Sequence, residues 1–150
     1  MADIKSPEER SRNMSLIRSN DTKPEIWLRK QLFSHGYRYR KNVNGIPGRP
    51  DIWLAKYNTA VFVNGCFWHR HDGCKYAYMP KSRAQFWTEK FQKNVERDAV
   101  VARQLDARGI RRLVVWECTV NGALKRPEKT ECLIRNIQSF LISEESSLEL

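Results

Sequence analysis

Long apolar runs are missing from this chain of 150 residues, and so are internal repeats, linkers and low-complexity segments. A helix that crosses a bilayer needs roughly 20 consecutive apolar residues, and no run approaches that length. Residues 1–10 also lack the apolar core of a secretory signal peptide. The sequence therefore predicts one soluble domain without a membrane partner, located in the cytoplasm, where thiols stay reduced.

Acidic side chains are scarce as well. The chain has 17 Asp and Glu residues against 27 Lys and Arg residues, which gives a formal net charge of +10 and a pI near 9.7. A domain this basic usually binds a polyanion, so nucleic acid is the expected partner. The alternative is that the positive charge serves only solubility.

Cysteine is rare, with four residues, but two of them share one polar loop with a histidine. Cys66, His71 and Cys74 have spacings that a short turn can bring together around zinc, which takes four ligands in a tetrahedron. The fourth ligand must then be distant. Cys118 follows an apolar run and is better placed than Cys132, which is expected to be inert core. The sequence predicts a structural zinc site; the alternatives are small buried hydrophobes or disulfides.

Capping residues and hydrophobic periodicity predict a short N-terminal helix and then the order helix, three strands, helix, strand, helix. The expected helices cover residues 6–19, 22–35, 82–108 and a last segment from 127, and the expected strands cover 37–40, 52–55, 61–63 and 112–116. Strands 52–55 and 61–63 are close enough to pair as a hairpin. This order predicts an α/β fold, a single domain with a mixed central β-sheet flanked by helices on both faces.

Three regions are expected from composition. Residues 1–20 should form an arm that becomes ordered on a partner, residues 21–142 the main domain, and residues 143–150 a frayed acidic tail. The arm is basic and poor in apolar residues, which is unfavourable for a packed helix.

A carboxylate and an imidazole are expected near each other on this scaffold. Asp51 falls at the start of a strand whose neighbour leads into the predicted zinc loop, and His69 lies in that loop. Carboxylate oxygens bind Mg²⁺, and an imidazole beside the metal-bound water or phosphate completes the parts needed for metal-assisted phosphodiester cleavage. The alternative is that Asp51 is only a turn residue after Pro50.

Several motifs together resemble the very short patch repair (Vsr) endonucleases, over the region from about Ser11 to Cys118. The motifs are Ser11-Arg12-Asn13-Met14, Asp21-Thr22 with Glu25, Pro47-Gly48-Arg49-Pro50-Asp51, Gly65-Cys66-Phe67-Trp68-His69, Phe86-Trp87 with Lys93-Asn94-Val95-Glu96-Arg97-Asp98, and Val115-Trp116-Glu117-Cys118. The resemblance implies a fold like that of type II restriction endonucleases. It also implies an enzyme that nicks DNA 5′ to the thymine of a T:G mismatch produced when 5-methylcytosine deaminates.

The resemblance implies a role for each matching residue. It makes Asp51 the Mg²⁺ ligand together with the backbone carbonyl of Val63, His69 the catalytic histidine, and Glu25 and Asp98 assisting acids. It makes Cys66, His71, Cys74 and Cys118 the ligands of a structural Zn²⁺. It assigns DNA contacts to Met14, Phe67, Trp68, Trp87 and Asn94, the aromatic rings serving as wedges beside the mismatch. The implied partners are mismatched duplex DNA, general mismatch-repair proteins and a repair polymerase in the bacterial cytoplasm, with the enzyme acting as a monomer.

The residues themselves leave other interpretations open. Glu25 is also the third residue of a capping box, Asp98 suits a solvated helix face, and Trp87 suits a helix core. The chain departs from the family pattern at Val63, where a hydroxyl residue is expected, and at Asn64, where a second histidine is expected. Also missing is the Glu-x-Lys pair that many restriction-type nucleases carry.

Two other functions compete with mismatch repair. One is a restriction-type or other nicking endonuclease of the same fold, since fold does not determine function. The other is a zinc-stabilised DNA-binding module without catalysis.

Overall fold

The computed structural model describes residues 21–150. The predicted helix 6–19 and Met14 lie outside the described residues. The elements are α2 (Lys23–Ser34), β1 (Ile52–Leu54), the 3-10 helix η1 (Ala55–Tyr57), β2 (Thr59–Asn64), α3 (Ala84–Ala107), β3 (Arg111–Trp116), α4 (Glu117–Lys125), α5 (Pro127–Ile142) and β4 (Ser147–Glu149). None of the helices in this part of the chain combines the length and the apolar character that a membrane span requires.

Four strands form one mixed sheet in the order β1-β2-β3-β4. The first two pair antiparallel, with Ile52 opposite Val61, and this confirms the predicted hairpin. The pairs β2-β3 and β3-β4 are parallel. Since parallel neighbours need a long crossover, α3 connects β2 to β3 across the sheet.

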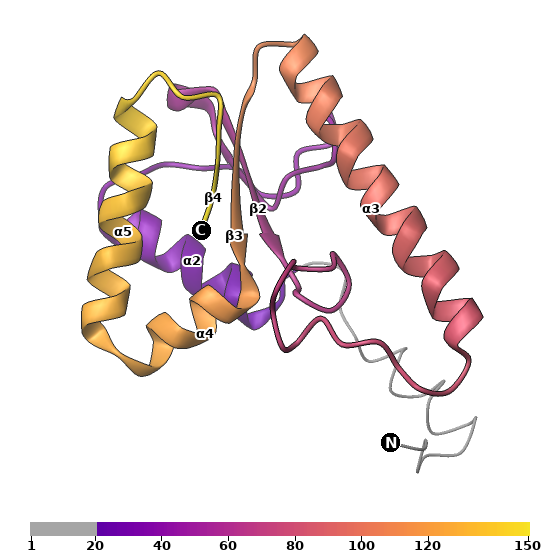
Figure 1. Cartoon of the computed structure of the whole chain (residues 1–150). Coiled ribbons are helices and arrows are strands. Elements are labelled where there is room, and N and C mark those ends of the chain that lie inside the picture. The colour runs from indigo at the N-terminus through magenta and orange to yellow at the C-terminus, as the bar shows by residue number, and fades with distance from the viewer. Residues whose placement is uncertain (1–20) are drawn as a thin grey trace.

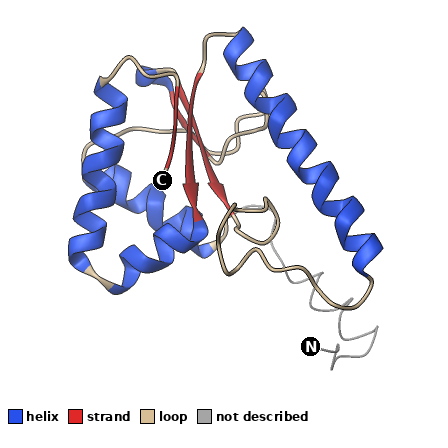
Figure 2. Ribbon diagram, in the orientation of Figure 1, coloured by secondary structure: helices blue, strands red, loops and turns tan. Residues whose placement is uncertain are grey.

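Helices cover both faces of the sheet, as predicted. The long helix α3 lies on one face, and α2, α4 and α5 lie on the other (Figures 1 and 2). Successive strand residues point to opposite faces, so Leu113 and Val115 pack toward α2, α4 and α5, whereas Val114 and Trp116 pack with Cys66. The main core therefore lies between the sheet and the three-helix layer, and the loop that carries the cysteines lies at one end of β2 and β3.

Two predictions about strands are wrong. Residues 37–40 form no strand; only Arg40 pairs, in an isolated bridge with Trp53, because β1 is three residues long and offers little edge to pair with. The tail is not frayed either, since Ser147–Glu149 form β4. Leu148 and Leu150 pack against the main core, which supplies the apolar contacts that hold this strand on β3.

Arg111 explains how the chain turns from α5 into β4. Its guanidinium donates to the carbonyl oxygens of Phe140, Leu141 and Ser143, which are at the end of α5. The Nε atom donates to the Glu145 carbonyl at 3.0 Å. Carbonyls at a helix C-terminus lack intrahelical partners, so one side chain satisfies several of them and directs the tail toward the sheet.

The prediction that Cys132 lies in the core is wrong. Cys132 is exposed rather than core, because α5 buries the next two residues, Leu133 and Ile134. Phe86 and Val95 are exposed on α3, which buries only Phe91 and Leu105. The helix α4 was not predicted from the sequence.

Gly48 is expected to be a sensitive position. Its φ is +78°, and a Cβ atom there would lie 2.5 Å from Val101 Cγ1 on α3. We therefore expect Gly48→Ala to lower the free energy of unfolding by about 1–3 kcal/mol. Gly45→Ala is the matched control, since a Cβ at Gly45 meets nothing within 4 Å. Urea unfolding measures both variants; equal stabilities would contradict this close approach.

Candidate active site and metal centre

Four residues that were predicted to be catalytic line one pocket of about 460 Å³. They are Glu25, Asp51, His69 and Asp98, and they come from α2, the position just before β1, the loop after β2, and α3. Val63, Asn64, Arg49, Arg97 and Arg112 line the same pocket. The acids are therefore surrounded by basic side chains, a combination that suits a phosphodiester held beside a cation.

Asp51 is held in an unusual electrostatic state. Its Oδ2 accepts a hydrogen bond of 2.7 Å from the Val63 amide. Burial raises the pKa of Asp51 to about 7, and the nearby charge of Glu25 adds to the increase, while the Val63 amide, Arg29 and His69 oppose it. A bound divalent cation would reverse this balance, because it favours the ionised carboxylate.

Glu25 is almost fully buried, with 3% of its surface exposed. Its backbone amide donates to Thr22 Oγ1 at 3.5 Å, as expected when Thr22 caps the helix. However, the Glu25 carboxylate does not bond back to Thr22: Oε2 accepts from the Asp21 amide at 2.8 Å and from Arg29 Nη2 at 3.1 Å. The capping box is therefore only half formed, and capping accounts neither for the contacts of the Glu25 carboxylate nor for its position in the pocket.

His69 and Asp98 form a close pair. The distance from His69 Nδ1 to Asp98 Oδ2 is 2.7 Å, although the residues are 29 positions apart. A carboxylate accepts from an Nδ1–H group, so this contact leaves Nε2 as the free ring nitrogen. Asn94, one turn earlier on α3, donates to the Trp68 carbonyl at 3.0 Å. The helix thus positions both the imidazole and the loop, and DNA contact by Asn94 stays a prediction.

The predicted zinc ligands come together. One ligand atom from each of Cys66, His71, Cys74 and Cys118 lies within 4.8 Å of the other three. The distance from Cys118 Sγ to His71 Nδ1 is 3.5 Å. Ligands about 2.3 Å from zinc lie roughly 3.8 Å apart in a tetrahedron, so the four groups fit such an ion. Cys118 lies in the first turn of α4, so the cluster joins the loop to that helix.

Two contacts shape the ligand set. The His71 ring stacks on Trp116, with centroids 4.1 Å apart and an interplanar angle of 5°. Burial raises the pKa of the Cys66 thiol to about 12, whereas a hydrogen bond from the Tyr76 backbone amide lowers the pKa of Cys74. Three sulfurs and one imidazole suit zinc, which would stabilise the thiolate forms.

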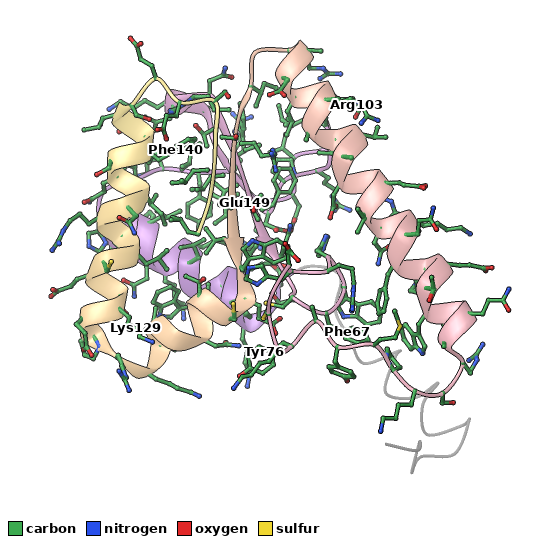
Figure 3. All side chains as sticks on the ribbon, in the orientation of Figure 1. Phe67, Tyr76, Arg103, Lys129, Phe140 and Glu149 are labelled. Carbon is green, nitrogen blue, oxygen red and sulfur yellow. The ribbon has the colours of Figure 1, made fainter. Side chains whose placement is uncertain are left out.

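An aromatic cluster lies between the cysteine loop and the start of α3. Phe67 is at its centre, with ring centroids 5.0–5.5 Å from Trp68, Tyr78, Trp87 and Phe91. Figure 3 places Phe67 in the segment that connects β2 to α3. Phe67, Trp68 and Trp87 are half-buried rather than enclosed in the core. Their rings are thus packed on each other and partly open to a ligand.

Some residues of this region were not identified from the sequence. Arg49, Arg97 and Arg112 line the pocket, and Arg29 contacts Glu25. The spacing of Glu25 and Arg29, one helical turn apart, was the one local signal available. Tyr78, Met79 and Phe86 are exposed beside the aromatic cluster, and no sequence pattern distinguishes such residues from core.

Comparisons with known proteins identify the family of this chain. A family model described as DNA mismatch endonuclease Vsr matches residues 2–75. The DNA mismatch endonuclease Vsr of Escherichia coli (strain K12) is 37% identical over 150 residues, covering 100% of this chain and 94% of the relative. The type II nicking enzyme V.NmeAIP of Neisseria meningitidis is 44% identical, with 92% of this chain and 98% of the relative covered. V.XorIIP of Xanthomonas oryzae, also a type II nicking enzyme, is 42% identical, with coverages of 91% and 97%.

The mixed sheet, the acidic pocket and these similarities define a DNA endonuclease of restriction endonuclease-like fold that nicks its substrate. The chain belongs to the Vsr DNA mismatch endonuclease family. The resemblance seen in the sequence motifs is thereby confirmed.

Proposed function

We propose that this enzyme nicks one strand of duplex DNA 5′ to the thymine of a T:G mismatch, with Mg²⁺ in the active site and Zn²⁺ as a structural ion. The observation that carries the proposal is the pocket shared by Asp51, Glu25 and the His69–Asp98 pair. His69 lies on the loop that also carries Phe67 and Trp68 of the aromatic cluster and three ligands of the cysteine cluster, Cys66, His71 and Cys74. Cleavage and mismatch recognition would thus share one segment of the chain.

The proposed metal ligands are the Asp51 carboxylate and the Val63 carbonyl, and both residues line the pocket. Mg²⁺ bound there would stabilise the charge that develops on the attacked phosphate. His69 would accept a proton from the attacking water through Nε2, while Asp98 holds the ring at Nδ1 and stabilises the imidazolium. Arg97 and Arg112 would hold the flanking phosphates, since guanidinium groups bind phosphate oxygens in pairs.

Recognition of the mismatch is assigned to the aromatic cluster. Inserting an apolar ring between base pairs costs about a few kcal/mol of stacking, and the cost is lowest at a mismatched pair. Phe67, Trp68 and Trp87 pack on one another by edge and tilted contacts. A ring that inserts beside a nucleobase is therefore supported by its aromatic neighbours. The exposed Phe86 contacts Trp87 and the exposed Tyr78 contacts Phe67, so both extend the apolar surface.

Zinc would have no chemical role. Four ligands from the protein fill a tetrahedral ion and leave no open position for water. The zinc would fasten the loop that carries Phe67, Trp68 and His69 to the first turn of α4. After the nick, a polymerase and general mismatch-repair proteins are the expected next partners.

A duplex comparison tests the function. With Mg²⁺, a duplex with one T:G pair should be nicked at least about 100-fold faster than the same duplex with C:G, because the few kcal/mol saved in unstacking enters the rate. Each strand carries a different dye, and denaturing gels should show product only from the thymine strand. Chelation of the metal with EDTA should stop the reaction.

Other outcomes of this experiment point to the competing functions. Equal rates on the T:G and C:G duplexes would identify a restriction-type nicking enzyme. Specific binding of the mismatched duplex without a nick would indicate a DNA-binding module. Either result would contradict the proposed function.

A further inference from the structure

Arg29 is a buried cation that the proposed mechanism does not use. It lies on α2 and is 5% exposed. Its Nη1 donates to Asp21 Oδ1 at 2.7 Å. Its Nη2 donates to Glu25 Oε2 at 3.1 Å and to the main-chain oxygen of Asp51 at 3.4 Å. One guanidinium therefore connects an acid of the pocket to the chain segment that carries the proposed metal ligand.

Stability of the fold is a weak reason for an arginine at this position. Burial removes the hydration of the guanidinium, and Arg29 Nε has no hydrogen-bond partner within residues 21–150. Buried ion pairs are often no more stable than apolar side chains of the same volume. What arginine does provide, and lysine does not, is a planar fork with donors in fixed directions.

The contacts of Glu25 show what this fork can position. Oε2 accepts from both Arg29 and the Asp21 amide, whereas no residue within the described part of the chain bonds Oε1. Two donors on one oxygen restrict the rotation of the carboxylate. The other oxygen is then left for the pocket that Glu25 shares with Asp51.

We infer that Arg29 is a positioning residue for cleavage: it orients Glu25 and holds the Asp51 main chain so that both carboxylates face one metal ion and its water. This inference rests on the proposed function, because it needs a metal between the two acids. It assigns Arg29 no contact with DNA, metal or the reacting atoms.

An Arg29→Lys variant tests the inference, because lysine keeps the charge and loses the fork. At saturating T:G duplex we expect kcat to fall about 10- to 100-fold, since small misplacements of a catalytic group have effects of this size. KM for the duplex should change less than about twofold, and the Mg²⁺ concentration that gives half the maximal rate should rise. Arg135→Lys, on the exposed side of α5, is the matched control and should leave all three values unchanged.

A Glu25→Gln variant separates this inference from the proposed function. If Arg29 acts mainly through Glu25, the double variant Arg29→Lys/Glu25→Gln should be slower than Glu25→Gln by much less than the factor lost in Arg29→Lys, the remainder coming from the contact with the Asp51 main chain. Fully additive losses in the double variant would overturn the inference. A normal kcat and a normal Mg²⁺ requirement in Arg29→Lys, together with an impaired Glu25→Gln, would overturn it as well. The proposed function would survive both outcomes. Full activity of Glu25→Gln would instead remove Glu25 from the mechanism and overturn this inference, while the proposed function would still stand on the T:G nicking of that variant.

Asp21→Asn decides the question if Arg29→Lys does not fold. The Asp21 side chain is 37% exposed, so its replacement is mild, and it removes the charge that holds Nη1. We expect a kcat loss of about fivefold, smaller than that of Arg29→Lys, with the same rise in the Mg²⁺ requirement. An Asp21→Asn enzyme with both values unchanged would overturn the inference.

Discussion

Replacing Asp51 by Asn is expected to lower the single-turnover rate of nicking at T:G mismatches by about 1000-fold, which corresponds to about 4 kcal/mol of transition-state stabilisation. The amide keeps the size of the side chain and can still accept from the Val63 amide, but it is a poor ligand for Mg²⁺ beside an anionic phosphate. The affinity for mismatched duplex, measured without metal by fluorescence anisotropy, should stay within about threefold, because DNA affinity depends mainly on cationic contacts.

Activity and folding can be separated in this variant by its stability without metal. The folded-state pKa of Asp51 is raised from 3.8 to about 7, so the neutral carboxyl is the form that the fold favours. The contribution of Asp51 to stability is present below pH 3.8 and is lost as the pH rises to about 7. At pH 8 the wild type should therefore be less stable than Asp51→Asn, by at most about 4 kcal/mol at about 1.4 kcal/mol per pKa unit.

Urea unfolding in EDTA at pH 8 and pH 5 measures this difference, which should shrink at the lower pH. Adding Mg²⁺ at pH 8 should stabilise only the wild type, since the cation restores the charged form. Normal nicking by Asp51→Asn would show that the metal is held elsewhere, and the proposed active site would be abandoned.

The second large effect is expected at the cysteine cluster. Cys118→Ser should lose bound zinc and unfold at a temperature at least about 10 °C lower than the wild type, because binding of a structural zinc contributes directly to folding. Cys118 provides the ligand from α4, whereas the other three come from the loop. Without it, the loop that carries Phe67 and His69 is no longer fastened to the helix, so nicking should fall as well.

Cys132→Ser is the matched control, because Cys132 is exposed on α5 and is not a member of the cluster. Metal analysis of the purified proteins should give about one zinc per chain for the wild type and for Cys132→Ser. Thermal unfolding followed by circular dichroism gives the stabilities. Full zinc content and an unchanged unfolding temperature in Cys118→Ser would remove Cys118 from the site.

Features that depend on residues close together in the chain could be predicted from the sequence. The hairpin of β1 and β2, the long helix α3 and the mixed sheet follow from patterns within a few residues of each other. Three of the four cysteine-cluster ligands lie within nine positions, from Cys66 to Cys74, so their spacing could be recognised directly. Their places in the predicted strand and loop already suggested a pair of Asp51 and His69, and the family motifs then assigned their roles. The fold places both residues in one pocket.

The other features of the fold and of the site depend on contacts between residues far apart in the sequence. The pairing of His69 with Asp98 depends on α3 crossing the sheet, and the burial of Arg29 depends on α2 packing beside the start of β1. The tail forms β4 because Leu148 packs against the main core. The acidic residues around Leu148 gave no sign of this packing in the sequence. The sequence by itself determined which chemical groups the protein has and most of its local elements. Only the tertiary structure decided which groups are neighbours and which lose water, because those depend on the packing of segments far apart in the chain.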